Sequence, residues 1–310
     1  MVGSAITRCL RDLGYENLIL RTHAELDLAE QEAVRDFFRD ARPEIVIDAA
    51  ARVGGILANR DYPAEFIRQN LAIQTNVIHE AWHAGVRRLL FLGSSCIYPR
   101  DCPQPIREEY LLTGPLELTN RPYALAKICG AEMCWSYNRQ HGTEFLAAMP
   151  TNVYGPFDNY DLETSHVLPA LLRKTHEAMR ARADSVQVWG TGQPLREFIH
   201  SDDLARACIF LVAMESSRLE GLLRSTDGPP LINIGTGEEI SIVGLAEMVC
   251  EVVGFKGAIR WDPDKPDGTP RKCLDVSRMH ALGWRAMIGL REGIRRTYED
   301  FQRRPGVAGP

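Results

Sequence analysis

The run Leu89-Leu90-Phe91-Leu92-Gly93-Ser94-Ser95-Cys96 joins four consecutive apolar residues to a glycine and three other small residues. An apolar run of this length is typical of a strand that is buried on both faces, and the small residues mark the loop where it ends. Comparable apolar runs lie at 18–20, 45–47 and 145–147. Segments with helical periodicity lie between them, at about 29–40, 64–84 and 122–140. This alternation predicts an α/β fold with a doubly wound parallel sheet, which binds ligands beyond the carboxyl ends of its strands.

The N-terminal segment departs from this alternation. Residues 1–14 have helical periodicity and end at Gly14, which suits the C-terminal cap of a helix. A Rossmann-like sheet normally begins with a strand and a glycine-rich turn, and only Gly3 could belong to such a turn here. We therefore expect the first strand and most of the turn to be missing, which would leave apolar faces of two neighbouring strands uncovered. The alternative is a chain that simply begins with a helix.

Composition limits the class of function. The 310 residues are 45% hydrophobic and 25% charged, which is enough for one large domain or two ordinary ones. No apolar run approaches the roughly 20 residues that span a bilayer. The net charge is −5 and no basic block is present, so we expect neither nucleic acid nor a membrane as partner.

The distribution of residues along the chain suggests two parts. Proline and glycine become denser after about residue 150. We predict a dinucleotide-binding domain at 1–150 and a smaller substrate-binding lobe at 151–310, with some of its strands and helices returning to the first sheet. The eight cysteines form no C-x-x-C pair, and neither a signal peptide nor a metal-ligand cluster is recognisable. These features favour a reduced, cytoplasmic protein without a bound metal.

A possible catalytic pair follows the strand at 89–92. Tyr123-Ala-Leu-Ala-Lys127 places a phenol and an ammonium on one face of a helix. A nearby ammonium favours the phenolate and lowers the pKa of a tyrosine, which can then serve as general acid or base. The hydroxyls of Ser94 and Tyr123 could reach the same carbonyl oxygen. The alternative is a surface tyrosine beside a solvated lysine.

A serine after this strand followed by Y-x-x-x-K resembles the extended short-chain dehydrogenases/reductases. The resemblance is closest to their GDP-L-fucose synthase family and extends from about residue 18 to about 300. It implies 3,5-epimerisation of GDP-4-keto-6-deoxy-D-mannose and NADPH-dependent reduction at C4, in a homodimer. The runs that carry it are Ala50-Ala-Arg-Val-Gly-Gly-Ile, Phe91-Leu-Gly-Ser-Ser-Cys-Ile-Tyr-Pro, Pro122-Tyr-Ala-Leu-Ala-Lys, Met149-Pro-Thr-Asn-Val-Tyr-Gly-Pro, Ser165-His-Val-Leu-Pro-Ala-Leu-Leu, Arg196-Glu-Phe-Ile-His-Ser-Asp-Asp and Lys265-Pro-Asp-Gly-Thr-Pro-Arg-Lys.

The resemblance also assigns roles in catalysis. Ser94 and Tyr123 would hold O4 of the sugar, and Tyr123 would protonate it. Lys127 would tune Tyr123 and bind the nicotinamide ribose. Cys96 would be the base and His166 the acid that invert C3 and C5, since modest shifts bring the pKa of a thiol or an imidazole close to neutrality. The alternatives are a buried apolar thiol at Cys96 and a capping or surface histidine at His166.

The predicted second strand leads into Arg21, where folds that select NAD place a carboxylate. After this strand, the first carboxylate is that of Glu25, four residues beyond Arg21. A basic residue suits the 2′-phosphate, so NADPH is the predicted cofactor. An ordinary solvated arginine is the alternative. The resemblance implies further NADPH contacts from Gly3, Asp27, Leu28, Ala49, Ala50, Leu92, Gly93, Ser94, Ser95, Tyr123, Lys127, Pro150, Thr151, Asn152, Val153 and His166.

For the nucleotide-sugar, the resemblance implies contacts from Asn152, Lys174, Trp189, Arg196, Asp267 and Lys272. The basic side chains would neutralise the diphosphate, and Trp189 would pack on the base or the sugar. Two other functions remain open. A nucleotide-sugar epimerase or dehydratase of the same fold keeps the tyrosine and lysine but does not need Cys96 with His166. A catalytically defective relative that binds a nucleotide-sugar is the other, suggested by the missing strand.

Overall fold

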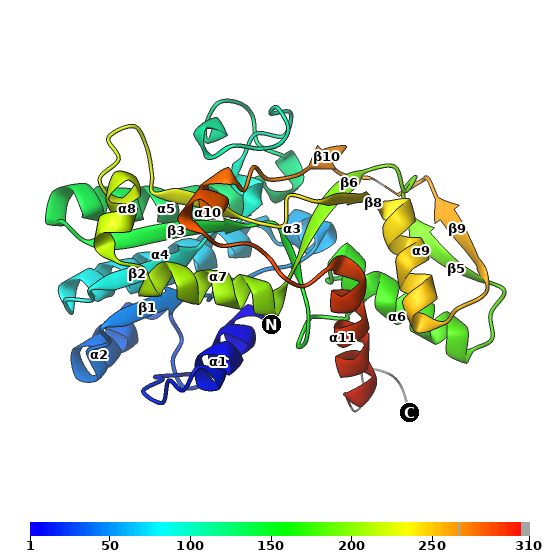
Figure 1. The fold of residues 1–310 in the computed structure, drawn as a ribbon, viewed down its shortest axis with the longest axis horizontal. Coiled ribbons are helices and arrows are strands. Elements are labelled where there is room, and N and C mark those ends of the chain that lie inside the picture. Colours follow the sequence, from blue (N-terminus) through cyan, green and yellow to red (C-terminus); the bar gives the residue numbers. More distant parts are fainter. Residues whose placement is uncertain (266, 305–310) are drawn as a thin grey trace.

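The computed structural model describes residues 1–265 and 267–304, which form two regions with separate hydrophobic cores (Figure 1). Pro266, inside the run at 265–272, and residues 305–310, the end of the predicted second lobe, lie outside the described residues. Within the described ranges, no helix is both long enough and apolar enough to cross a membrane.

The first region is built on a four-stranded parallel sheet with the order β1-β2-β3-β7. Its strands are β1 (Ile45–Asp48), β2 (Arg88–Leu92), β3 (Glu144–Pro150) and β7 (Leu231–Ile234). In the register of the sheet, Val46 lies beside Leu89, and Leu89 lies beside Phe145. The predicted Rossmann-like doubly wound fold is confirmed, and three of the predicted strands belong to this sheet.

Helices cover both faces of this sheet because β2 is apolar on both sides. Leu90 and Leu92 face one core, and Leu89 and Phe91 face the other, as the two-residue period of a strand requires. One face is covered by α1 (Val2–Asp12), α7 (Ser201–Ala213), α8 (Ser216–Leu223) and α10 (Ser277–Leu282). The other face is covered by α2 (Gln31–Ala41), α4 (Pro63–His83) and α5 (Arg121–His141). The predicted helices at 29–40, 64–84 and 122–140 correspond to α2, α4 and α5.

The predicted strand at 18–20 is wrong. This segment has no regular secondary structure, and Ile19 and Leu20 are 45% and 48% exposed. A strand needs a hydrogen-bonded neighbour, and in the described chain β1 pairs only with β2. The free side of β1 is correspondingly open, with Ile45 37% exposed. Ile45 is the apolar residue of β1 that this edge leaves exposed.

The N-terminal helix forms as predicted. Helix α1 spans Val2–Asp12, and Gly14 follows it with φ +84°, donating its N–H to the carbonyl of Arg11. A left-handed glycine at this point satisfies the carbonyls at the end of a helix. Ala5 and Ile6 are buried and pack with Leu204 and Cys208 of α7, which places α1 beside α7 (Figure 1).

The second region lies on the opposite side of the molecule from α2 and α8 (Figure 1). It contains the sheet β10-β6-β4, with β8 antiparallel to β6, and the pair β5-β9. The strands are β4 (Asn152–Tyr154), β5 (Ser185–Trp189), β6 (Leu195–His200), β8 (Glu239–Ser241), β9 (Ala258–Asp262) and β10 (Arg271–Lys272). The helices α6 (Val167–Arg180), α9 (Ile242–Val253) and α11 (Leu290–Arg303) pack around them. The boundary proposed near residue 150 stays a prediction, and β7 returns to the first sheet.

One buried carboxylate holds the loops that connect the two regions. Glu197 on β6 accepts backbone N–H groups from Thr236 and Gly237 with one oxygen, and from Leu274 with the other. These donors satisfy a carboxylate that has no exposed surface. Glu197 thereby fixes the loop after β7 and the segment after β10 against the same strand.

The close approach of α5 to β2 gives the first prediction. A Cβ at Gly130 would collide with the ring of Phe91, so we expect Gly130→Ala to lower the free energy of unfolding by about 1–3 kcal/mol. The matched control is Gly221→Ala on α8, where no atom lies within 4 Å of the added Cβ. That change should stabilise the helix by up to about 1 kcal/mol. Urea unfolding followed by circular dichroism measures both, and equal effects would contradict the packing argument.

Candidate active site

The carboxyl end of β2 turns directly into the site. Ser94 caps the short 3-10 helix Ser95–Ile97, and its Oγ accepts the backbone N–H of Cys96 at 3.2 Å. Ser95 and Ile97 are buried and anchor this turn, whereas Ser94 and Cys96 are partly exposed. The turn therefore presents a hydroxyl and a thiol to the same side of the sheet edge.

Helix α5 brings Tyr123 and Lys127 against this strand end. Lys127 is 2% exposed, and its ammonium donates to the carbonyl of Leu92 at 2.7 Å and lies 4.5 Å from the centre of the Phe91 ring. The Tyr123 ring makes an edge-to-face contact with Phe66 of α4, with centroids 6.3 Å apart. These contacts fix both side chains at the carboxyl edge of the parallel strands, where a ligand is expected.

The protonation of Tyr123 differs from the prediction. Burial raises its pKa well above the ordinary value of a tyrosine, negative charge at Cys96 raises it further, and a hydrogen bond with Ser94 opposes both effects. Lys127 lies 6.0 Å from the phenol ring and is not among the causes. The predicted lowering by the ammonium is therefore wrong in this structure, where desolvation of the buried phenol raises its pKa instead. Tyr123 keeps its proton, which suits a proton donor.

Lys127 is influenced by a buried carboxylate that the sequence reasoning missed. Burial lowers the pKa of Lys127 to about 8, and Asp48, at the end of β1, opposes this shift. Asp48 is buried, and one of its oxygens accepts the backbone N–H of Ala50. In the sheet, Asp48 lies beside Phe91, whose ring the ammonium covers. A single carboxylate at the end of an apolar run was the available sequence signal.

His166 is the N-terminal cap residue of α6. The loop before it is docked by Gly55, whose N–H donates to the carbonyl of Thr164 at 2.8 Å. Although part of the ring is exposed, the surrounding protein desolvates it and lowers its pKa, and the ammonium of Lys272 lowers the pKa further. His166 and Lys272 thus lie in one electrostatic environment.

Two donors converge on the sulfur of Cys96. The amide Nδ2 of Asn120 lies 3.3 Å from Sγ, and the Nζ of Lys272 lies 3.5 Å from it. Asn120 ends the 3-10 helix Leu118–Asn120, and Lys272 lies on β10. The sequence reasoning placed Lys272 with the nucleotide-sugar and missed Asn120, which no motif singled out.

The other residues predicted to bind the nucleotide-sugar form a separate group. Lys174 of α6 lies over the Trp189 ring, 4.6 Å from its centre. Arg196 donates to the carbonyl of Asp267 at 3.4 Å, and the Asp267 carboxylate accepts the N–H and hydroxyl of Thr191. The side chain of Asn152, on β4, donates to the carbonyl of Glu197 instead. Cations and an indole therefore meet around the ends of β5 and β6, which suits an anionic group attached to a ring.

Most of the residues predicted to bind the cofactor lie at one sheet edge. They follow three adjacent parallel strands: Ala49 and Ala50 follow β1, Leu92, Gly93 and Ser95 end or follow β2, and Pro150, Thr151, Asn152 and Val153 end or follow β3. A buried ammonium, a phenol and a hydroxyl at this edge fit a nicotinamide ribose. Lys127, Tyr123 and Ser94 are the side chains that would hold it.

The remaining predicted cofactor residues lie in α1 and in the segment that connects α1 to α2. Gly3 is exposed in the first turn of α1. The guanidinium of Arg21 donates to the carbonyl of Leu20 and lies 5.6 Å from the centre of the Phe37 ring. Asp27 accepts the N–H of Ala29, and the carbonyl of Leu28 accepts the side-chain amide of Asn76.

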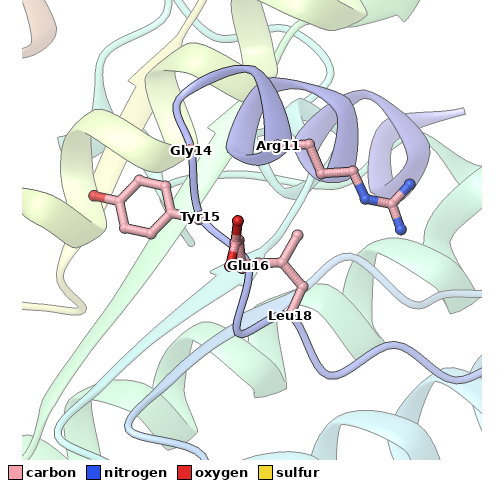
Figure 2. Close-up of a pocket in the computed structure, with 5 residues that line it drawn as sticks. All are labelled: Arg11, Gly14, Tyr15, Glu16 and Leu18. Carbon is pink, nitrogen blue, oxygen red and sulfur yellow. The ribbon is translucent and has the colours of Figure 1, made fainter.

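A large hollow lies at the end of α1. Its volume is about 400 Å³, and it is lined by Arg11, Gly14, Tyr15, Glu16 and Leu18 at the end of α1 (Figure 2). Figure 2 shows Arg11 and Tyr15 pointing away from each other on either side of it. None of the predicted site residues lines the hollow, so its size does not mark the site of chemistry.

Residues 1–227 match the model of the NAD dependent epimerase/dehydratase family. The chain belongs to this family. Its members combine the observed sheet with a nicotinamide cofactor, in agreement with the arrangement of Lys127, Tyr123 and Ser94.

Individual proteins that are similar to this chain align with nearly all of it. The Putative GDP-L-fucose synthase 2 of Arabidopsis thaliana is 56% identical over 299 residues, 96% of this chain and 88% of the relative. The GDP-L-fucose synthase of Escherichia coli (strain K12) is 52% identical over 303 residues, 97% of this chain and 93% of the relative. The solved GDP-mannoheptose C4 reductase MlghC from Campylobacter jejuni, with NADP bound, is 38% identical at a TM-score of 0.86 and covers 97% of this chain and 95% of its own.

The pKa of Lys127 predicts a pH dependence of cofactor binding. At pH 7 the side chain is mostly an ammonium, which can donate a charged hydrogen bond. At pH 9 it is mostly the neutral amine. We expect the Kd of a reduced nicotinamide dinucleotide to rise roughly fivefold between pH 7 and pH 9, because a hydrogen bond from a charged donor becomes a neutral one. Titration of the cofactor's fluorescence measures this. Lys127→Met should bind more weakly and with a flat profile, and an equal slope in both proteins would exclude Lys127 as its origin.

Proposed function

We propose that the protein converts GDP-4-keto-6-deoxy-D-mannose to GDP-L-fucose, by epimerisation at C3 and C5 and NADPH-dependent reduction at C4. The observation that carries the proposal is the position of Cys96. It lies two residues after Ser94, and two hydrogen-bond donors contact its sulfur. A nucleotide-sugar 4-epimerase needs the tyrosine and lysine but not such a thiol. The relatives named GDP-L-fucose synthase support the substrate.

The epimerisation uses the acidity of hydrogens next to a ketone. The Cys96 thiolate removes the proton from C3 or C5 and becomes a thiol, and the electron pair of the broken C–H bond moves to O4 as an enolate. The hydroxyls of Ser94 and Tyr123 stabilise that oxygen. The His166 imidazolium then protonates the carbon on the other face, and the C4 ketone forms again. Each inversion therefore moves one proton to Cys96 and one from His166.

The reduction uses the same oxygen site. NADPH, when bound, supplies the hydride for C4. Tyr123 donates its phenolic proton to O4 and leaves an alcohol at C4. Its raised pKa keeps that proton available at neutral pH. Lys127, held under Leu92, is placed to bind the nicotinamide ribose and to stabilise the phenolate that remains.

The surroundings of Arg21 support NADPH over NADH. The carboxylate that follows it most closely, Glu25, accepts both the N–H and the hydroxyl of Thr22, at 2.7 and 2.8 Å. The Glu25 carboxylate is therefore already hydrogen-bonded within its own turn. Arg21, by contrast, is exposed and carries the charge that a 2′-phosphate requires.

The GDP part is assigned to the group around Trp189. Lys174 and Arg196 would neutralise the diphosphate, and the exposed Trp189 ring offers a face for the base or the sugar. Arg196 of this group is the register partner of Lys272, and Lys272 contacts Cys96. Strands β6 and β10 therefore connect the group around Trp189 with the thiol. This order along the site matches a nucleotide-sugar that enters with its sugar towards the thiol.

The test of the function is the loss of NADPH absorbance when GDP-4-keto-6-deoxy-D-mannose is added to the purified protein. We expect loss that depends on this substrate, together with GDP-L-fucose identified by nuclear magnetic resonance. A C4-reduced product without inversion at C3 and C5 would contradict the epimerase part. The absence of any substrate-dependent loss would contradict the proposal as a whole.

Two variants test the roles of Cys96 and Tyr123. Without NADPH, epimerisation introduces deuterium at C3 and C5 from heavy water, and we expect Cys96→Ser to slow this at least about 100-fold, because the base is lost. NADPH binding should remain, because Cys96 is not assigned to the cofactor. Tyr123→Phe should lower reduction by at least about 100-fold. Wild-type turnover in either variant would remove that residue from the mechanism.

A further inference from the structure

The side chain of Lys272 makes a different contact from the other residues predicted to bind the nucleotide-sugar. Lys174 and Trp189 contact each other, and Arg196 contacts Asp267. The ammonium of Lys272 instead lies 3.5 Å from Sγ of Cys96. The predicted substrate ligand therefore contacts a predicted catalytic group directly.

Asn120 makes the second contact to this sulfur, at 3.3 Å. A neutral thiol is a weak acceptor and gains little from two donors, whereas a thiolate is stabilised by an amide N–H and above all by an ammonium. The two donors come from distant parts of the chain, one just before α5 and the other on β10. Their convergence on one sulfur is thus a product of the tertiary structure.

Both donors are held by backbone that is itself fixed. β10 pairs with β6, where Lys272 lies beside Arg196. The next two residues are anchored as well, since Cys273 N–H donates to Gln104 and Leu274 N–H donates to Glu197. Asn120 is the N-terminal cap residue of α5, the helix that carries Tyr123 and Lys127. The donors therefore keep their places without a ligand.

We infer that Lys272 and Asn120 form a donor pair that positions the sulfur of Cys96 and stabilises negative charge on it when Cys96 acts as the base of the epimerisation. This inference rests on the proposed function and assigns to Lys272 an action on the reacting thiol. Lys272 and Asn120 are positioning residues, because they act through Cys96.

The environment of Cys96 gives its proton a route to solvent. A cavity of about 30 Å³ is lined by Cys96, Asn120 and Lys272, and it extends to the exposed Arg100 and Arg271. A space of this size holds a water molecule. Neither Ser94 nor Tyr123 lines the cavity. The thiol can lose its proton there before the second inversion.

The first readout is alkylation of Cys96 by iodoacetamide across pH, followed by peptide mass spectrometry. At pH 7 we expect Lys272→Gln to react about tenfold more slowly than wild type, and Asn120→Ala about threefold more slowly. At high pH the rates should converge, because every thiol is then ionised. Lys272→Arg should keep most of the rate. The exposed Lys256→Gln is the matched control, and the exposed Cys129 is an internal reference.

The shape of the pH curve separates this role from a merely structural one. A variant that only opened or closed access to the thiol would change the rate by the same factor at every pH. Superimposable curves for Lys272→Gln and wild type would overturn the inference. Circular dichroism and NADPH affinity establish that the variants are folded.

The second readout is deuterium incorporation into the substrate from heavy water without NADPH. The pH profile of Lys272→Gln should move to higher pH on both limbs, because the same ammonium favours the thiolate and lowers the pKa of His166. If wild type incorporates no deuterium at C3 or C5, the proposed function fails. If wild type does so and the profile of Lys272→Gln is unmoved, the inference about Lys272 fails while the function stands.

Discussion

The contact between Gly130 and the ring of Phe91 sets the distance between α5 and β2, and the site depends on that distance. No other side chain fits between the helix and the strand at this point. The close approach lets Lys127, one turn earlier on the helix, reach the carbonyl of Leu92 from beneath the sheet edge. It also places Tyr123 beside Ser94, where the strand ends. A helix held further away would leave the ammonium without its carbonyl partner and the phenol without its serine.

Burial then decides the protonation of these groups. The same desolvation raises the pKa of Tyr123 and lowers that of Lys127 to about 8, so that both groups are less charged than in water. Asp48 works against this effect at Lys127. At the other end of the site, the more open Lys272 adds positive charge beside Cys96 and lowers the pKa of His166. The proposed reduction thus uses the buried end and the proposed epimerisation the more open end.

Local patterns predicted the helices and three strands well, because their apolar periodicity reports burial directly. They failed at 18–20, where the apolar run is genuine but no neighbouring strand pairs with it in the described chain. Asp48 and Asn120 were missed for a related reason. Each acts on a group that lies far away in the sequence, and neither belongs to a motif with its partner.

The sequence by itself determined the parallel sheet, the Tyr123–Lys127 pair on one helical face and the strand end that carries Ser94 and Cys96. These follow from periodicity and from spacings of a few residues, which the backbone translates directly into geometry. Only the tertiary structure decided that Lys272 contacts Cys96 and that burial raises the pKa of Tyr123. Both depend on desolvation and on contacts between segments that are distant in the chain, and no local pattern encodes either.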